Sequence, residues 1–191
     1  MHSGLMDAAR EVFAARGYER ASLQQIADRA GFTKGAVYSN FASKPDLFVA
    51  AYQRRIEEWV DDVEPRLTEA LAAAESLDVV AERLAETLTA EVDSGPSQQL
   101  ALAEFRLLAV RSDEVRAAYE RLLEQRVALI ADALARHPLT AGRPVEGNRA
   151  IAFAALALVG ALTLERSAAP GMVDDDLVRE AIAGCLKGLL A

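Results

Sequence analysis

A capped helix, a glycine turn and a second capped helix follow one another within residues 22–40, and this pattern constrains the fold more than any other feature. The Ser22 hydroxyl and the Gln25 side chain can each satisfy a backbone amide at a helix start, as in a capping box. Gly31 supplies the backbone angles of a tight turn, and Thr33 can cap the helix that follows. Two short helices joined by a turn with glycine predict a helix-turn-helix.

Helical signals continue on both sides of this motif. Apolar residues at helical spacing predict a first helix of about twelve residues that ends at Gly17, in the position of a left-handed cap. After the motif, the sequence SKPD begins a helix with a serine cap and with proline in the first turn, where it is tolerated. Further amphipathic helices are predicted at 44–73 with a break or kink near Pro65, 77–93, 97–110, 112–136, 147–168 and 174–190. The prediction is an all-α protein of about nine helices, with a three-helix head over 1–48 and a helical bundle over 49–191.

Composition and length are those of a soluble helical protein. The 191 residues are 52% hydrophobic, enough for a substantial core. The single cysteine, Cys185, can form neither a disulfide within the chain nor a cysteine-based zinc site. The first residues lack the features of a signal peptide, and the longest apolar run, 151–164, is shorter than the roughly 20 residues that a helix needs to cross a bilayer. We therefore expect a cytoplasmic protein without a membrane span.

Charge divides the chain into two parts. The net charge is -8, yet residues 1–55 contain eight Lys and Arg against five Asp and Glu. DNA responds to the local field of the surface that approaches it, so an acidic total does not exclude DNA binding.

The helix after the glycine turn has a face that suits DNA. On a helical wheel, Val37 and Phe41 fall on the core side, whereas the opposite arc has small side chains, hydroxyls and almost no carboxylate. Hydroxyls, an ammonium and helix-start amides can donate to phosphates, and the Ala36 methyl can touch a thymine methyl. Tyr38 can reach a phosphate at the groove wall. Lys44 lies in the first turn of the next helix, where the helix dipole disfavours a cation. Its place there makes sense if Lys44 pairs with an anion outside the protein, such as DNA phosphate.

Residues 8–48, AAREVFAARGYERASLQQIADRAGFTKGAVYSNFASKPDLF, resemble the DNA-binding head of the tetracycline-repressor (TetR) family of bacterial regulators. The likeness includes the Gly-Tyr after the first helix, the Ile-Ala of the second and the Tyr-x-x-Phe-x-x-Lys of the third. It implies that these residues touch DNA: Ser22, Gln24, Lys34, Gly35, Ala36, Tyr38, Ser39, Asn40 and Lys44. Thr33 joins them from the exposed face of the third helix.

The resemblance also divides these residues by role. Tyr38 and Lys44 are expected to bind phosphates, while the candidates for base edges are Gln24, Lys34, Ala36 and Asn40. Many relatives carry a basic arm before the first helix, but only MHSG precedes it here. This departure leaves minor-groove contact open.

The rest of the chain resembles the family only in its architecture, which implies a helical body that binds a small effector and forms a homodimer. The run 151–164 and the final helix supply two apolar faces, and a helix that is apolar on nearly all sides must be buried. We predict a homodimer through the last two helices; the alternative is that these faces form the core of a monomer. A twofold dimer places two recognition helices in successive major grooves, roughly 34 Å apart, on an inverted repeat.

Aromatic residues between the fourth and eighth predicted helices indicate a mostly apolar effector site with one cation, Arg106. The candidate lining residues, each of which can also be plain core, are Tyr52, Trp59, Phe105, Arg106, Tyr119 and Phe153. The resemblance implies that effector binding weakens operator binding by a coupling that is typically about 1–3 kcal/mol. The helix that runs from Lys44 to Trp59 is the expected link between the two sites.

These observations predict a ligand-responsive transcriptional regulator, a repressor that a small, mostly apolar effector of unknown identity releases from a palindromic operator. The alternative is a DNA-organising or division-control protein that uses the same head without a metabolite switch. An enzyme is not expected, because only His2 and His137 are present and the phosphate-loop and nucleophile-elbow patterns are missing. The acids at 174–176 lie at a helix start, where acids are favoured anyway, so neither a metal nor a cofactor is expected.

Overall fold

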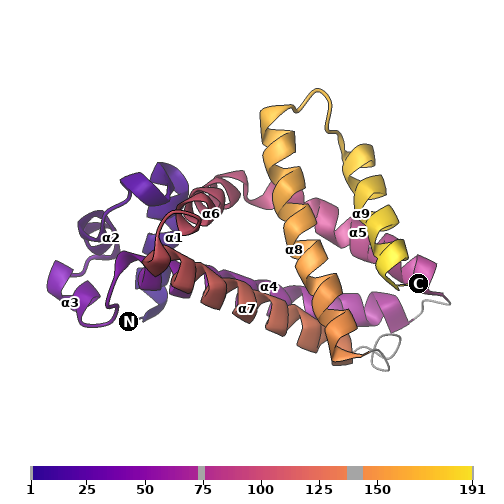
Figure 1. Cartoon of the computed structure of the whole chain (residues 1–191), viewed down its shortest axis with the longest axis horizontal. Helices are drawn as coiled ribbons and strands as arrows, with labels where there is room; N and C mark the ends of the chain where they lie inside the picture. Colours follow the sequence, from indigo (N-terminus) through magenta and orange to yellow (C-terminus); the bar gives the residue numbers. More distant parts are fainter. Residues whose placement is uncertain (1, 73–75, 137–143, 191) are drawn as a thin grey trace. The chain divides into compact units, whose positions relative to one another are not determined.

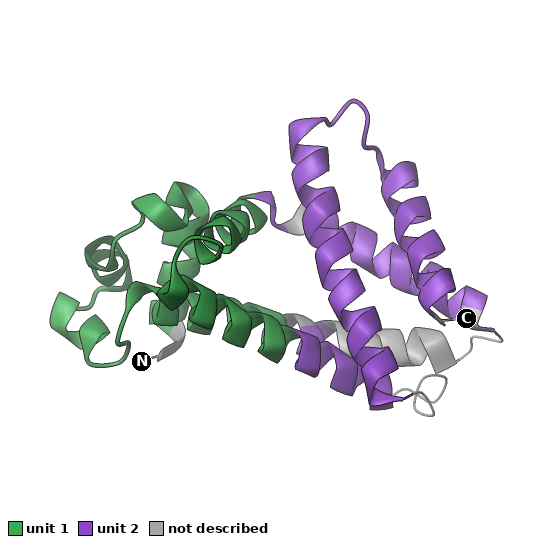
Figure 2. Ribbon diagram, viewed as in Figure 1, with its two compact units in different colours: residues 1–57, 97–126 green, residues 58–96, 127–191 purple. Residues whose placement is uncertain are grey.

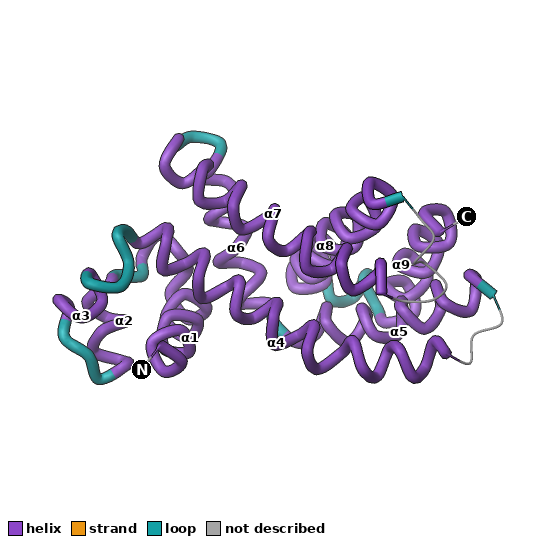
Figure 3. Tube along the Cα trace, turned by 90° about the horizontal axis from the view of Figure 1, so that it is seen from below, coloured by secondary structure: helices purple, strands orange, loops and turns teal. Residues whose placement is uncertain are grey.

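The computed structural model of the chain describes residues 2–72, 76–136 and 144–190 (Figure 1). Every regular element in these ranges is a helix, and the trace contains helices and loops alone (Figure 3). The nine helices are α1 His2–Arg20, α2 Leu23–Ala30, α3 Lys34–Tyr38, α4 Lys44–Ala72, α5 Leu77–Ser94, α6 Pro96–Ala109, α7 Asp113–Arg136, α8 Val145–Ala168 and α9 Asp175–Leu190. The predicted all-α fold is confirmed.

The chain divides into two compact units that do not follow its order (Figure 2). The first unit consists of residues 1–57 and 97–126, and therefore combines α1–α3 with the first parts of α4 and α7 and nearly all of α6. The second unit consists of residues 58–96 and 127–191. The predicted boundary between residues 48 and 49 separates a DNA-binding domain from an effector-binding and dimerisation domain, not two compact units. It stays a prediction.

An aromatic cluster forms the centre of the first unit. Phe13 of α1, Phe48 of α4 and Phe105 of α6 are all fully buried. The ring centroids of Phe13 and Phe48 are 4.9 Å apart, and those of Phe48 and Phe105 are 4.3 Å apart. Tyr18 packs edge-on against both Phe48 and Phe105. Because aromatic side chains bury large apolar areas, this cluster fixes the helix-turn-helix against α6 as well as against α4.

Local signals produce the helix-turn-helix as the sequence predicts. The Gln25 amide donates to the Ser22 hydroxyl at 3.2 Å, and the Ser22 amide donates to the Gln25 side chain at 3.1 Å, which completes the capping box. Gly31 ends α2 in the left-handed conformation, with φ 71°. The Thr33 hydroxyl accepts from the Ala36 amide at 3.2 Å and so caps α3. However, α3 ends at Tyr38, two residues earlier than expected.

Gly17 differs from the predicted helix end. Its φ of 76° is positive, as expected, but its ψ of 168° is extended rather than left-handed helical, and helical structure resumes as far as Arg20. In the helical turn that follows Gly17, the Glu19 N–H donates to the Glu104 carboxylate of α6 at 3.3 Å. The kink therefore depends on a contact that is distant in sequence. At Pro65 the helix is not broken, because α4 continues through that residue, and a kink there stays a prediction.

Replacing Gly17 by alanine is expected to lower the free energy of unfolding by about 1–3 kcal/mol, because a side chain at this positive φ is strained. An added Cβ would also lie 2.5 Å from the Glu104 carboxylate oxygens. Urea unfolding measures the change. Gly4→Ala is the matched control on the same helix, since an added Cβ meets nothing within 4 Å there and alanine favours helix. Equal stability of the two variants would contradict this account of the kink.

Helices α5, α8 and α9 pack together in the second unit (Figure 1). Val80 and Val92 of α5, Ile151 of α8, and Val178 and Ile182 of α9 form its buried core. Of the described helices, α8 alone is long and apolar enough to cross a membrane by length and composition, because its 24 residues extend beyond the apolar run 151–164. Core helices of soluble proteins pass the same test, so this single helix is weak evidence for a membrane span.

Candidate nucleic-acid interface

The residues predicted to contact DNA lie in or directly beside α2, α3 and the start of α4, and most of them face solvent. The exposed ones are Ser22, Gln24, Thr33, Lys34, Gly35, Tyr38, Ser39 and Asn40, while Ala36 and Lys44 are half-buried. Beneath them, Val37 and Ile26 are fully buried, and Phe41 is partly buried against the same core. One side of α3 therefore anchors the helix and the other side stays accessible.

Tyr38 is the most prominent apolar group on this surface. Half of its side chain is exposed, at 50%. The Lys34 ammonium lies 5.6 Å from the centre of the Tyr38 ring, within the range of a cation–π contact. The sequence of α3, KGAVY, has no carboxylate. This helix thus presents a cation and a phenol side by side, without an acid that would repel phosphate.

Asn40 is exposed, although a continuous helix would turn it towards the core. The reason is that α3 ends at Tyr38. The Asn40 side chain donates through Nδ2 to the Ala36 carbonyl at 2.7 Å, and the Ser39 hydroxyl donates to the same carbonyl at 2.9 Å. Gln24 has a similar local partner, Asp28, at 2.7 Å. Gln24 and Asn40 would have to leave these partners in order to bind base edges, and Ser39 would have to leave its partner in order to donate to DNA.

Lys44 lies against α1. Its ammonium donates to the Glu19 carbonyl at 3.0 Å and sits 4.4 Å from the centre of the Tyr18 ring. Burial lowers the pKa of this ammonium, whereas the carboxylates of Glu19 and Glu104 raise it. A cation is favourable next to the last carbonyls of a helix, so Lys44 stabilises the end of α1. An ammonium has three donors, so a phosphate contact of Lys44 stays a prediction.

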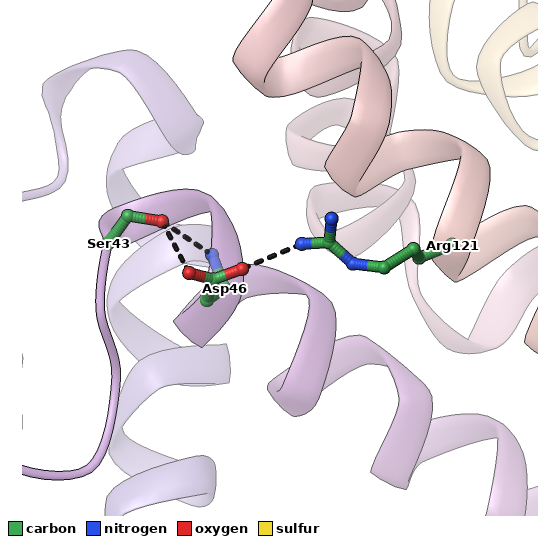
Figure 4. Close-up of polar contacts among 3 residues, drawn as sticks. All are labelled: Ser43, Asp46 and Arg121. Atoms are coloured by element: carbon green, nitrogen blue, oxygen red, sulfur yellow. Dashed lines mark hydrogen bonds and ion pairs between the residues drawn. The ribbon is translucent and has the colours of Figure 1, made fainter.

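The start of α4 is tied to α7 by three residues (Figure 4). The Ser43 hydroxyl accepts from the Asp46 amide at 3.3 Å and donates to one oxygen of the Asp46 carboxylate at 2.8 Å. The other carboxylate oxygen pairs with the Arg121 guanidinium of α7 at 2.7 Å. A half-exposed ion pair of this kind contributes only about 0–1 kcal/mol to stability. Its location matters more, because it connects α7 to the helix start that carries Lys44.

Four of the six residues predicted to line an effector site lie in the first unit. Tyr52 is buried and donates its hydroxyl to the Gln98 carbonyl at 2.8 Å. Arg106 donates through Nε to the Tyr119 hydroxyl at 3.0 Å. Phe105 is fully buried in the aromatic cluster and serves the core.

The other two candidates are not brought into this group by the described structure. The Trp59 side chain lies outside the described residues. Phe153 belongs to the second unit and is 52% exposed on α8. Their part in an effector site stays a prediction.

Arg126 of α7 is a charged residue near this group that the sequence analysis missed. Only 8% of it is exposed, and its Nε has no hydrogen-bond partner. The sequence pattern that indicates its burial is the helical spacing of Val115, Ala118 and Leu122, which are all buried. Continuing this stripe by four residues leads to Arg126, a cation in a position that normally takes an apolar side chain.

Known proteins resemble this chain most clearly in the part that contains the helix-turn-helix. Residues 5–51 match the family described as bacterial regulatory proteins, tetR family. The HTH-type transcriptional activator FasR of Mycolicibacterium smegmatis is 44% identical over 63 residues, which are 33% of this chain and 29% of that protein. The fatty acid metabolism regulator protein of Bacillus subtilis is 26% identical over 121 residues, 63% of this chain and 62% of that protein. The chain thus spans less than two thirds of the length of these relatives.

Solved structures with the same fold cover the whole chain. A Rhodococcus protein described as a TetR-family transcriptional regulator superposes with a TM-score of 0.68 and 20% identity over 100% of both chains. FadR of Bacillus subtilis, in complex with stearoyl-CoA, superposes with a TM-score of 0.57 and 17% identity over 97% of both chains. At these identities the structures show the fold alone. Residues 5–51 therefore form a domain of the tetR family of bacterial regulatory proteins, and the chain as a whole has the all-helical fold of these solved structures.

Proposed function

We propose that this protein is a ligand-responsive transcriptional repressor that acts in the cytoplasm as a homodimer on an inverted-repeat operator. The observation that carries the proposal is the accessible face of α3, which is free of carboxylates and rests on a fully buried Val37. A short helix supported in this way can enter the major groove of DNA without losing its packing. The domain that residues 5–51 match is found in bacterial regulatory proteins.

The second unit supports a homodimer. Exposed apolar or small residues follow one side of α8 and one side of α9, and they are Ala150, Phe153, Ala157, Ala161, Leu177, Gly184 and Gly188. Phe153 and Leu177 leave 52% and 48% of their side chains in water in a single chain. A second copy that packs its own α8 and α9 on these faces would remove them from water, with small residues that allow close approach.

The nature of the effector is suggested by relatives. The Bacillus subtilis relative is named a fatty acid metabolism regulator, and FadR was solved with stearoyl-CoA. We therefore take the effector of this chain to be a molecule with an acyl chain, which refines the apolar effector expected from the sequence. Its binding to the body would weaken operator binding through α4 and α7, which both continue from the first unit into the second.

Selection of bound fragments from genomic DNA by the purified protein tests the proposal. We expect a short inverted repeat upstream of few genes, and an affinity that falls steeply with salt. If a dimer neutralises about six phosphates, the slope of log affinity against log salt is about -5. An acyl-chain ligand should release the DNA.

Binding spread over many genomic sites, without release by any ligand, would favour the DNA-organising alternative. If binding of the protein to its operator increased transcription, repression would be refuted but DNA binding and the ligand response would not. Transcription from the operator should therefore be measured directly, because the FasR relative is named an activator.

A further inference from the structure

Arg126 is a buried charge with incomplete hydrogen bonding. It lies in α7 within the first unit, 8% of it is exposed, and its Nε has no partner. Burial lowers the pKa of its guanidinium to about 10, so it remains charged at neutral pH. The other groups that shift this pKa include no described carboxylate, and they are Tyr119, Arg106, Tyr52 and Arg55.

Among the described groups that shift the pKa of Arg126, the two charged ones, Arg106 and Arg55, are positive. Arg106 and Arg55 both lower its pKa, which means that they disfavour its charged form. Arg106 lies 5.9 Å from the centre of the Tyr119 ring and donates to the Tyr119 hydroxyl. The Tyr52 hydroxyl is occupied by the Gln98 carbonyl, and burial keeps the pKa of Tyr52 well above its ordinary value. The Tyr52 phenol therefore supplies no counter-charge at neutral pH.

A buried cation without a counter-ion is costly for folding, since transfer of a charge from water is repaid only by a well-placed partner. A ligand that supplies the missing charge would offset this cost by binding to the folded protein. We propose that Arg126 binds an anionic group of the effector, so that the effector is an acid or a phosphate-bearing derivative rather than a neutral apolar molecule. This inference rests on the effector-responsive function proposed above and specifies the chemistry of its ligand.

The chemistry of the guanidinium narrows the choice of anion. A guanidinium presents a planar set of N–H donors that matches the oxygens of a carboxylate or a phosphate. The site predicted from the sequence had one cation, Arg106, whereas the structure brings the buried Arg126 close enough for Arg106 to lower its pKa. A carboxylate at the end of an acyl chain and the phosphates of an acyl-CoA ester share the required chemistry, and an experiment can separate them.

The test measures binding of dodecanoate, dodecanol and dodecanoyl-CoA to the full-length protein by calorimetry, below the micelle concentration of each. The wild type is expected to bind dodecanoate at least about tenfold more tightly than dodecanol. Arg126→Met should weaken dodecanoate by about tenfold or more and leave dodecanol unchanged. If only dodecanoyl-CoA depends on Arg126, the anionic group is a phosphate. Unchanged binding of both anionic ligands by the variant, or no binding of either by the wild type, overturns the proposal.

Two further measurements separate binding from structure. Arg116→Met is the matched control, because Arg116 lies exposed on the same helix, paired with Asp113 at 2.8 Å, and should bind every ligand like the wild type. Without ligand, Arg126→Met is expected to unfold at the same or a higher urea concentration, since an apolar side chain relieves the buried charge. A large loss of stability with wild-type ligand discrimination would show a structural role instead.

Should Arg126→Met fail to fold, Arg126→Lys takes its place, because it keeps the charge without the planar set of donors. Weaker binding of dodecanoate or of dodecanoyl-CoA by this variant supports the proposal, and wild-type affinity for both overturns it. Operator binding is measured separately on ligand-free protein, and we expect it to be equal in the wild type and the variants. Failure of the wild type to bind any operator would refute the regulatory function while the ligand measurements still stand.

Discussion

Tyr38→Ala is expected to abolish detectable operator binding. The side chain is 50% exposed beside Lys34, so its loss removes the proposed donor to phosphate without removing core packing. A hydrogen bond to a charged group is worth about 1.5–3 kcal/mol, and a dimer loses it twice, which corresponds to a fall in affinity of about two orders of magnitude or more. A gel-shift titration at constant salt measures the effect.

Two controls accompany this variant. Tyr38→Phe keeps the ring and removes only the hydroxyl, so it should lose nearly as much affinity if the hydroxyl donates to phosphate. Met172→Ala removes another exposed apolar side chain, 79% exposed in the loop before α9, and should bind DNA normally. Normal operator binding by a folded Tyr38→Ala protein would refute the assignment of α3 as the recognition helix.

Ala157→Glu is expected to convert the protein into a monomer. Ala157 is exposed on the apolar side of α8, and in a twofold dimer one substitution places two carboxylates in the interface. An unpaired buried charge costs several kcal/mol, enough to dissociate a dimer at micromolar concentration. Sedimentation measures the mass, and operator affinity should fall with it because a monomer contacts only one half-site.

Ala117→Glu is the matched control for this substitution. Ala117 is likewise an exposed alanine within a helix, but it lies on α7 in the first unit. This variant should keep the mass and the operator affinity of the wild type. If Ala157→Glu remains dimeric, the faces of α8 and α9 are not the interface, and the homodimer must be sought elsewhere.

The sequence alone determined the elements whose causes are local. The capping box of Ser22 and Gln25, the left-handed turn at Gly31 and the Thr33 cap all form between residues at most a few positions apart. Such contacts form with little loss of chain entropy, so they can be predicted without knowledge of the rest of the fold. The helix-turn-helix, and with it most of the candidate DNA contacts, was predictable for this reason.

Only the tertiary structure decided where distant groups meet. Glu104 reaches the turn after Gly17 from 85 residues away, Arg121 reaches Asp46 from 75, and Lys44 turns from solvent to the Glu19 carbonyl. No local pattern specifies these pairs, because each depends on how α6, α7 and α4 pack around the aromatic cluster. The burial of Arg126 is a further example. Arginine is usually exposed, and only the packing of the first unit makes this one a buried charge.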